Sequence, residues 1–375
     1  MVGAIATIMN SLNASKKPLY LTLLCVVGFL VFLLFTKGFG ASESITLAPV
    51  DCSDPNEEEV FTRCAPWNQA LSVESERGLS WEVDESFLID GHTVPTVMVM
   101  HNGGYRMFTS SPQRGVISVH GSDDGLNWLK MPLEFTAGGL PDECGEVLLD
   151  VSVRYLSDGQ YLLQAETWSR PEGVMNIGRA LVEDASKSEN PVTLCGWRSP
   201  DGDVWEAVSG ELFEPDAASW PSGFEALGFG SRSALYYVDT YPELDAIRIA
   251  LVRGDEVGSY GSREPLLERS HVDPNPVHII GGGVRLYHTH SAMTGELGAA
   301  DSDDGVIFGE DLPLEGLSGQ LCYTPPERPS PEDRCMFDPF YLRLNSGRMV
   351  LYFGVFETTA SGSDRKGIGR AFAVD

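Results

Sequence analysis

Three aspartates open segments of similar pattern, and they are the residues of this chain best suited to acid–base chemistry. The segments are DVSVRYLSDGQYLLQ from Asp150, DPNPVHIIGGGVRLYH from Asp273 and DPFYLRLNSGRMVLYF from Asp338, each with a glycine nine residues after its aspartate. Carboxyl groups that share a pocket repel one another, which separates their pKa values and can make one an acid and another a base. Hydrolysis of a glycosidic bond needs such a pair, with one carboxyl protonated and the other ionised.

Two further copies of the segment depart from this pattern. The first, VPTVMVMHNGGYRMF, begins with Val94 where the others have aspartate, although Asp90 and His92 lie just upstream and could supply a displaced carboxylate or imidazole. A looser copy, SGFEALGFGSRSALYYVD, contains Glu225. Each acid also has a structural interpretation, because an aspartate at the start of a strand often caps a turn.

Arginine and histidine side chains accompany these acids. Arg106 in YRMF and Arg285 in VRLY occupy equivalent places in the second strand of their copies, where they are expected to pair with the acids and help to bind substrate. His271 lies two residues before one of the aspartates, and His288 and His290 share one face of a strand. A metal site built from the three histidines is the alternative, but hydrogen bonding or lining of a pocket is favoured. No metal and no cofactor is therefore predicted.

The elements that must position these residues are β-hairpins. Asn102-Gly103, Asp158-Gly159, Gly281-Gly282 and Ser346-Gly347 supply the positive-φ positions of tight turns between paired strands. A second motif, Ser-x-Asp-Gly-x-x-aromatic, occurs as SDDGLNW, SPDGDVW and SDDGVIF and predicts capped turns. Five units of this kind cannot bury their faces separately but can do so radially. The sequence thus predicts an all-β, five-bladed β-propeller, closed by the strands of LSWEVDESFLID.

The segments beginning Asp-Pro, the hairpin glycine and the Ser-x-Asp-Gly turn resemble the five-bladed glycosidases of glycoside hydrolase families 43 and 32 and their relatives. The resemblance spans Leu79 to Asp375. It implies that Asp150 orients substrate or modulates the acid, that Glu225 is the acid, and that Asp273 and Asp338 fill the matching positions of the last two blades. The family's base or nucleophile is expected where Val94 stands.

Two functional hypotheses follow from this departure at Val94. One is a glycosidase-like propeller that binds a glycan, or polysaccharide, in its central funnel and hydrolyses it. The other is a catalytically inactive propeller that recognises carbohydrate or protein. Whether the chain is an enzyme stays open at this stage.

The N-terminal region predicts a membrane anchor. Residues 19–36 form an uncharged, apolar run of 18 residues, long enough to cross a hydrocarbon core of about 30 Å. Lys16 and Lys17 precede it, which predicts a cytoplasmic N-terminus at 1–18 and places the rest outside the cytoplasm. A cleaved signal peptide is the alternative. An acidic stalk at 37–78 and the propeller domain at 79–375 are expected to follow.

Charge and cysteine content agree with an extracytoplasmic domain. The formal net charge of −28 argues against nucleic acid as a partner, because a phosphate backbone needs cationic side chains. A surface protein kept soluble at high salt would also be this acidic. Six cysteines outside the apolar run suggest disulfides. The pairings favoured by proximity are Cys52–Cys64, Cys144–Cys195 and Cys322–Cys335.

Overall fold

The described part of the chain is built from β-strands. The computed structural model describes residues 70–111, 114–142, 144–156, 158–169, 193–208, 222–229, 232–241, 246–255, 264–266, 271–280, 282–290, 295–317, 334–358 and 364–374. Within these ranges no helix is long and apolar enough to cross a membrane. The predicted anchor at 19–36 lies outside the described residues, as do Cys52, Cys64 and Cys322.

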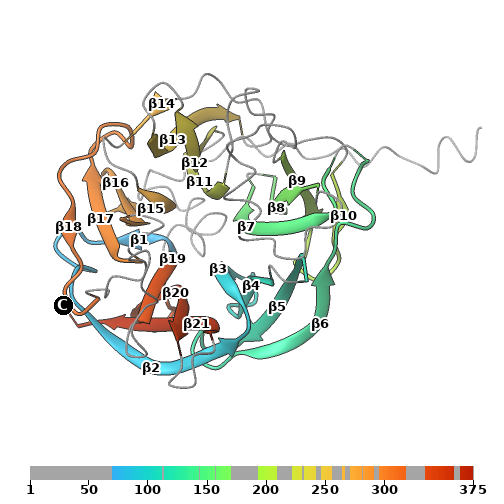
Figure 1. Ribbon diagram of the computed structural model, residues 1–375, viewed down its shortest axis with the longest axis horizontal. Helices are drawn as coiled ribbons and strands as arrows, with labels where there is room; N and C mark the ends of the chain where they lie inside the picture. The colour runs from blue at the N-terminus through green and yellow to red at the C-terminus, as the bar shows by residue number, and fades with distance from the viewer. Residues whose placement is uncertain are drawn as a thin grey trace, which may run out of the picture. The chain divides into compact units, whose positions relative to one another are not determined.

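The strands form antiparallel sheets that follow one another along the chain (Figure 1). The β3 sheet contains β3 (Thr93–Val99), β4 (Tyr105–Ser111), β5 (Val116–Ser122) and β6 (Leu129–Phe135). The β7 sheet contains β7 (Val147–Tyr155), β8 (Tyr161–Trp168), β9 (Thr193–Ser199) and β10 (Glu206–Ala207). The β11 sheet contains β11 (Ser222–Phe229), β12 (Arg232–Tyr241), β13 (Ala246–Asp255) and β14 (Glu264–Pro265).

Two more sheets complete the domain. The β15 sheet contains β15 (Val272–Ile279), β16 (Val284–Thr289), β17 (Leu297–Ser302) and β18 (Leu312–Pro313), and β1 (Ser72–Val73) adds to β15 in parallel. The β19 sheet contains β19 (Arg334–Arg343), β20 (Met349–Thr358), β21 (Asp364–Ala373) and β2 (Trp81–Asp90). Because β2 precedes β3 in the chain but pairs with β21, the predicted closure by LSWEVDESFLID is confirmed.

The first strand of each sheet lines a closed ring. β3 contacts β7, β7 contacts β11, β11 contacts β15, β15 contacts β19, and β19 returns to β3. In Figure 1 these strands lie nearest the centre and the later strands of each sheet lie outward. Each sheet buries its faces against its neighbours: Met98 and Val153 share one such core, and Tyr341 and Tyr287 stack in another. The predicted all-β propeller arrangement is confirmed.

Each inner strand carries an irregularity at the same place. The pairing of β3 with β4 shifts register between Thr93 and Pro95, and the other four inner strands shift at the corresponding step near their start. A β-bulge of this kind turns a side chain away from the regular alternation. Among the described residues, the only non-glycine residues with positive φ are Val94 (52°), Asp273 (54°) and Asp338 (51°), all at this step.

The capped turns form as predicted, and all three copies have the same hydrogen bonds. In SDDGLNW, the Ser122 hydroxyl accepts the backbone N–H of Gly125 at 2.9 Å, and Asp124 Oδ1 accepts the N–H of Asn127 at 2.9 Å. The copies at 199–205 and 302–308 repeat both contacts. The glycines of the turns and of the four hairpins have the expected positive φ. These local motifs therefore follow from hydrogen bonds between side chains and the nearby backbone.

One predicted disulfide is confirmed. Cys144 and Cys195 are bonded and link the chain just before β7 to β9. Cys335 also takes part in a disulfide, and its expected partner Cys322 lies outside the described residues.

Candidate functional site

The bulged positions of the inner strands form what we term the axial site, made of Val94, Asp150, Asp273 and Asp338. Each of these residues is partly exposed, whereas nearly every residue around it in its inner strand is buried. The reason is the bulge, which aims one side chain of an otherwise enclosed strand out of the packing between sheets. The inner strands of successive sheets are in contact, so these positions gather toward the centre of the ring.

Asp273 and Asp338 are in direct contact in the axial site. The backbone N–H of Asp338 donates to Asp273 Oδ2 at 3.4 Å, and the Thr289 hydroxyl donates to the same oxygen at 2.7 Å. Burial raises the pKa of Asp273, and these hydrogen bonds act in the opposite direction. Thr289 lies on β16, so the second strand of the β15 sheet supports the carboxylate of the first.

The pKa of Asp338 is perturbed more strongly than that of Asp273. Burial raises its pKa well above the usual value, and the nearby charges of Asp273 and Asp150 raise it further. Crowded carboxyl groups cannot all ionise, so one of them retains its proton. The structure thus brings together three of the four predicted catalytic acids, and the pKa of one of them, Asp338, is raised well above its usual value.

Val94 occupies the same structural position in β3 as the aspartates occupy in β15 and β19. Its backbone N–H donates a hydrogen bond to Asp338, so the valine lies directly beside this perturbed acid. A positive φ is unusual for a β-branched residue and costs on the order of 1–3 kcal/mol. The backbone at this point is therefore arranged as at an acid-bearing position, although the side chain is apolar.

Glu225 is the remaining predicted acid, and the two upstream candidates, Asp90 and His92, have partners outside the axial site. Glu225 pairs with Tyr236 just after the bulge of β11, and its side chain is outside the described part of the structure. Asp90 is at the end of β2, the outer strand of its sheet, where it forms an exposed ion pair with Arg365 at 2.7 Å. His92 is half-buried, accepts or donates a hydrogen bond with Thr109 at 3.1 Å, and has its pKa lowered by burial. Asp90 therefore does not replace the missing acid at position 94.

The two arginines pair with acids other than those of the axial site. Arg106 contacts Asp203 at 3.1 Å, in the capped turn of the adjacent sheet. Arg285 is fully buried, forms a bidentate pair with Asp301 at 2.7 and 2.8 Å, and donates to the carbonyl oxygen of Ser75 at 2.7 Å. Both arginines join neighbouring segments of the chain, which differs from the expected pairing with the leading acids.

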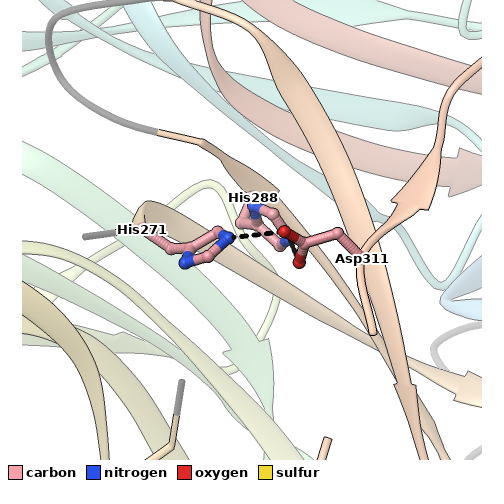
Figure 2. Close-up of side chains that lie close together, drawn as sticks. All are labelled: His271, His288 and Asp311. Atoms are coloured by element: carbon pink, nitrogen blue, oxygen red, sulfur yellow. Dashed lines mark hydrogen bonds and ion pairs between the residues drawn. The ribbon is translucent and has the colours of Figure 1, made fainter. Parts of the chain in front are cut away.

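His271, His288 and His290 lie close to Asp311, a residue that the sequence did not single out. Figure 2 shows Asp311 with His271 and His288. The distances from its carboxylate are 3.2 Å to His271 Nε2, 3.6 Å to His288 Nε2 and 3.7 Å to His290 Nδ1. Burial lowers the pKa of His288 to about 4. Interactions with His288, and then with His271, hold the pKa of Asp311 below its usual range.

Sequence reasoning missed Thr289 and Asp311 for different reasons. Thr289 stands between the two histidines of YHTHS, and the alternation of a strand places it on the opposite face from them, where it reaches Asp273. That signal was present in the sequence. Asp311 belongs to no repeated motif, and only the return of the chain to β18 brings it to the histidines.

Comparison with known proteins supports the fold and leaves the activity open. No known protein-family profile matches the sequence, and no curated protein matches it. A thermostable family-43 glycoside hydrolase superposes with a TM-score of 0.54 at 12% identity, covering 77% of this chain and 92% of its own. An α-L-arabinofuranosidase from Lactobacillus brevis superposes with a TM-score of 0.53 at 13% identity, covering 77% of this chain and 92% of its own.

A xylan β-1,4-xylosidase from Bacillus halodurans gives a TM-score of 0.53 at 12% identity, covering 76% of this chain. The match spans about half of the xylosidase, 54% of its length. The described domain therefore shares its fold with these three solved structures. Among the solved structures that share this fold, the three named here are glycoside hydrolases.

Proposed function

We propose that this chain is a five-bladed, glycosidase-like propeller, each sheet being one blade, that binds a glycan at the axial site and hydrolyses it there. The observation that carries the proposal is the carboxyl group of Asp338, which contacts Asp273 and whose pKa is raised well above its usual value by burial and by the charges of Asp273 and Asp150. Glycosidic bond cleavage requires a protonated carboxyl beside an ionised one.

Each acid has a distinct part in this proposal. Asp338 donates a proton to the leaving glycosidic oxygen. Asp150, whose charge acts on Asp338, takes the part of the ionised partner in this proposal. Asp273 accepts hydrogen bonds from Thr289 and from the backbone of Asp338, so its part is to tune and orient the donor.

The second candidate function is recognition of a glycan without cleavage. The observation that favours it is Val94, which holds the backbone conformation of an axial acid without the carboxyl group. A propeller that lacked its base would still present the other acids to sugar hydroxyl groups, and carboxylates accept hydrogen bonds from such groups.

Screening on a glycan array, followed by incubation with the glycans that bind, separates the two functions. The first substrates are α-L-arabinofuranosides and β-xylosides, the classes named for two solved structures of this fold. Hydrolysis is expected for the wild type, with a loss of at least about 100-fold in kcat for Asp338→Asn and with binding retained. Glu82→Gln, an exposed change on β2, is the matched control.

Val94→Asp distinguishes an incomplete site from an inactive fold. Binding without turnover in the wild type, together with turnover in Val94→Asp, would establish recognition as the function. If neither protein bound or cleaved any glycan, both candidate functions would be excluded.

We further propose that residues 19–36 anchor the chain and that the propeller lies outside the cytoplasm. The Cys144–Cys195 disulfide supports this proposal, because structural disulfides persist in oxidising compartments. Protease added to intact cells is expected to degrade the propeller and spare an epitope tag at the N-terminus. Protection of the propeller until the cells are lysed would refute this topology.

A further inference from the structure

The histidine cluster in the β15 sheet is separate from the axial acids, and the proposed hydrolysis does not use it. Its members come from successive segments of one sheet: His271 just before β15, His288 on β16, His290 just after β16, and Asp311 just before β18. One nitrogen or oxygen atom from each of His271, His288 and Asp311 lies within 4.8 Å of the others. Figure 2 shows both imidazole rings directed at the carboxylate.

The spacing of the cluster is close to that of a tetrahedral metal site. With metal–ligand bonds of about 2.0–2.1 Å, neighbouring ligand atoms in a tetrahedron lie about 3.3 Å apart. Asp311 Oδ2 lies 3.2 Å from His271 Nε2 and 3.7 Å from His290 Nδ1, and Asp311 Oδ1 lies 3.6 Å from His288 Nε2, all close to that value.

His288 provides an independent sign that a ligand is absent from the site. Its side chain is fully buried, and neither of its ring nitrogens has a hydrogen-bond partner within the described residues. The nearest carboxylate oxygen, on Asp311, is 3.6 Å away. A buried polar atom without a partner costs on the order of 1–3 kcal/mol, so such groups are rare in folded proteins. A metal ion bonded to Nε2 would satisfy this atom.

The surrounding packing also suits a metal. Gly298 pairs with His288 across the sheet, and a Cβ there would lie 2.6 Å from His290 Nε2 and 2.8 Å from His288 Cε1. The absence of a side chain at Gly298 thus leaves the room that the imidazole rings occupy.

We propose that His271, His288 and Asp311 bind one Zn²⁺ ion, with His290 at the fourth position. Imidazole with a single carboxylate suits Zn²⁺, whereas Ca²⁺ and Mg²⁺ prefer sites made of oxygen ligands. His290 and Asp311 also line a cavity of about 460 Å³, which provides a path for the ion to enter. The ion ties together segments of one sheet, and Thr289, between two of the ligands, holds Asp273 of the axial site.

Metal titration of the purified full chain tests this site without reference to any hydrolytic activity. After treatment with a chelator and dialysis, Zn²⁺ is titrated against a chromophoric indicator, and binding of one ion per chain with a rise in Tm is expected. Co²⁺ in place of Zn²⁺ is expected to show the visible absorption bands of tetrahedral coordination. No saturable binding of either ion would overturn the proposal.

Variants locate the ion in the cluster. Asp311→Asn and His271→Asn are each expected to weaken Zn²⁺ binding by at least about 100-fold, because loss of an outer-shell partner alone costs 10–100-fold. His120→Asn is the matched control, since His120 belongs to a buried histidine pair with His92 in the β3 sheet and lies outside the cluster. Unchanged affinity in both cluster variants would refute the assignment.

A gentler variant covers the case in which the substituted ligands prevent folding. Gly298→Ala retains every ligand but displaces the imidazole rings, so it is expected to weaken Zn²⁺ binding while Co²⁺ spectra shift away from the tetrahedral form. Wild-type affinity and spectra in a folded Gly298→Ala protein would contradict the proposed geometry.

Discussion

At the scale of single residues, the axial site contains two arrangements that are unfavourable for folding. Asp338 is a carboxyl group held beside two others, and Val94 is a β-branched residue held at positive φ. Both arrangements cost free energy of folding, and such costs concentrate where a protein binds or converts a ligand. The two residues therefore allow the strain to be measured separately from activity.

Asp338→Asn is expected to raise the stability of the domain at neutral pH. The folded-state pKa of Asp338 lies above its unfolded value, so its stabilising contribution is complete below about pH 4 and is lost as the pH rises through the folded-state pKa. The amide of the variant cannot ionise, so the variant does not lose this stability as the pH rises. Urea denaturation from pH 4 to 8 measures the difference, which should grow with pH. If the difference in stability between wild type and variant did not change with pH, a raised pKa of Asp338 would be contradicted. Asp123→Asn, in an exposed turn, is the control.

Val94→Gly is expected to leave stability unchanged or to raise it by up to about 1 kcal/mol. Glycine adopts positive φ without steric cost, which offsets the greater entropy of its unfolded state. Val97→Gly in the same strand is the control, because Val97 is fully buried and its loss should cost about 3 kcal/mol or more. Denaturant midpoints of the two variants provide the comparison. Equal losses would show that Val94 is not strained.

At the scale of elements, closure of the ring depends on the pairing of β2 with β21. Asp84 on β2 forms an ion pair with Arg370 on β21 at 2.7 Å, and Arg370 also donates to the carbonyl oxygen of Leu126 in the β3 sheet. One arginine thus connects the closing strand, the last strand and the neighbouring sheet. Loss of the contacts of Arg370 should therefore destabilise the pairing of β2 with β21 that closes the ring.

Asp84→Asn is expected to cost about 1 kcal/mol at neutral pH, after allowance for its partial exposure to solvent. Hydrogen bonds from Ser86, and then from Arg370, lower the pKa of Asp84 to about 2. Its contribution is therefore present above about pH 4 and is lost as the pH falls through 2. The gap between wild type and variant in urea denaturation should narrow from pH 4 to pH 2. A gap that stays constant over this range would exclude the linkage, and Glu82→Gln is the exposed control.

At the scale of the whole molecule, a disulfide and the pairing of distant strands both restrain the chain. The ring closes through β2 and β21, and the Cys144–Cys195 disulfide closes a second loop with a sequence separation of 51 residues around β7 and β8. Constraints of this length act mainly by reducing the entropy of the unfolded chain. The domain should therefore lose stability, and not its fold, when the disulfide is removed.

The double variant Cys144→Ala/Cys195→Ala is expected to lose about 2–4 kcal/mol of unfolding free energy. Thermal and denaturant unfolding under non-reducing conditions measure the loss, and far-UV circular dichroism checks that the β-structure remains. Val204→Ala, an exposed change in the same sheet region, is the control for a substitution that should not affect stability. Identical midpoints for the double variant and the wild type would show that the link contributes nothing to stability.

The sequence by itself determined the local features: the hairpins at Gly103, Gly159 and Gly347, the capped turns, the Cys144–Cys195 pair and the succession of strands that requires a radial arrangement. These follow from backbone sterics and short-range hydrogen bonds, which residue types at fixed spacing specify.

Only the tertiary structure decided which residues meet. Asp338 lies beside Asp273, and the charge of Asp150 raises its pKa, because separate sheets close into one ring. Asp311 reaches the histidines because β18 returns along the edge of its sheet. The partners of Arg106 and Arg285 were also settled by packing between segments. Contacts between residues far apart in the chain depend on ring closure, and no spacing within a repeat encodes them.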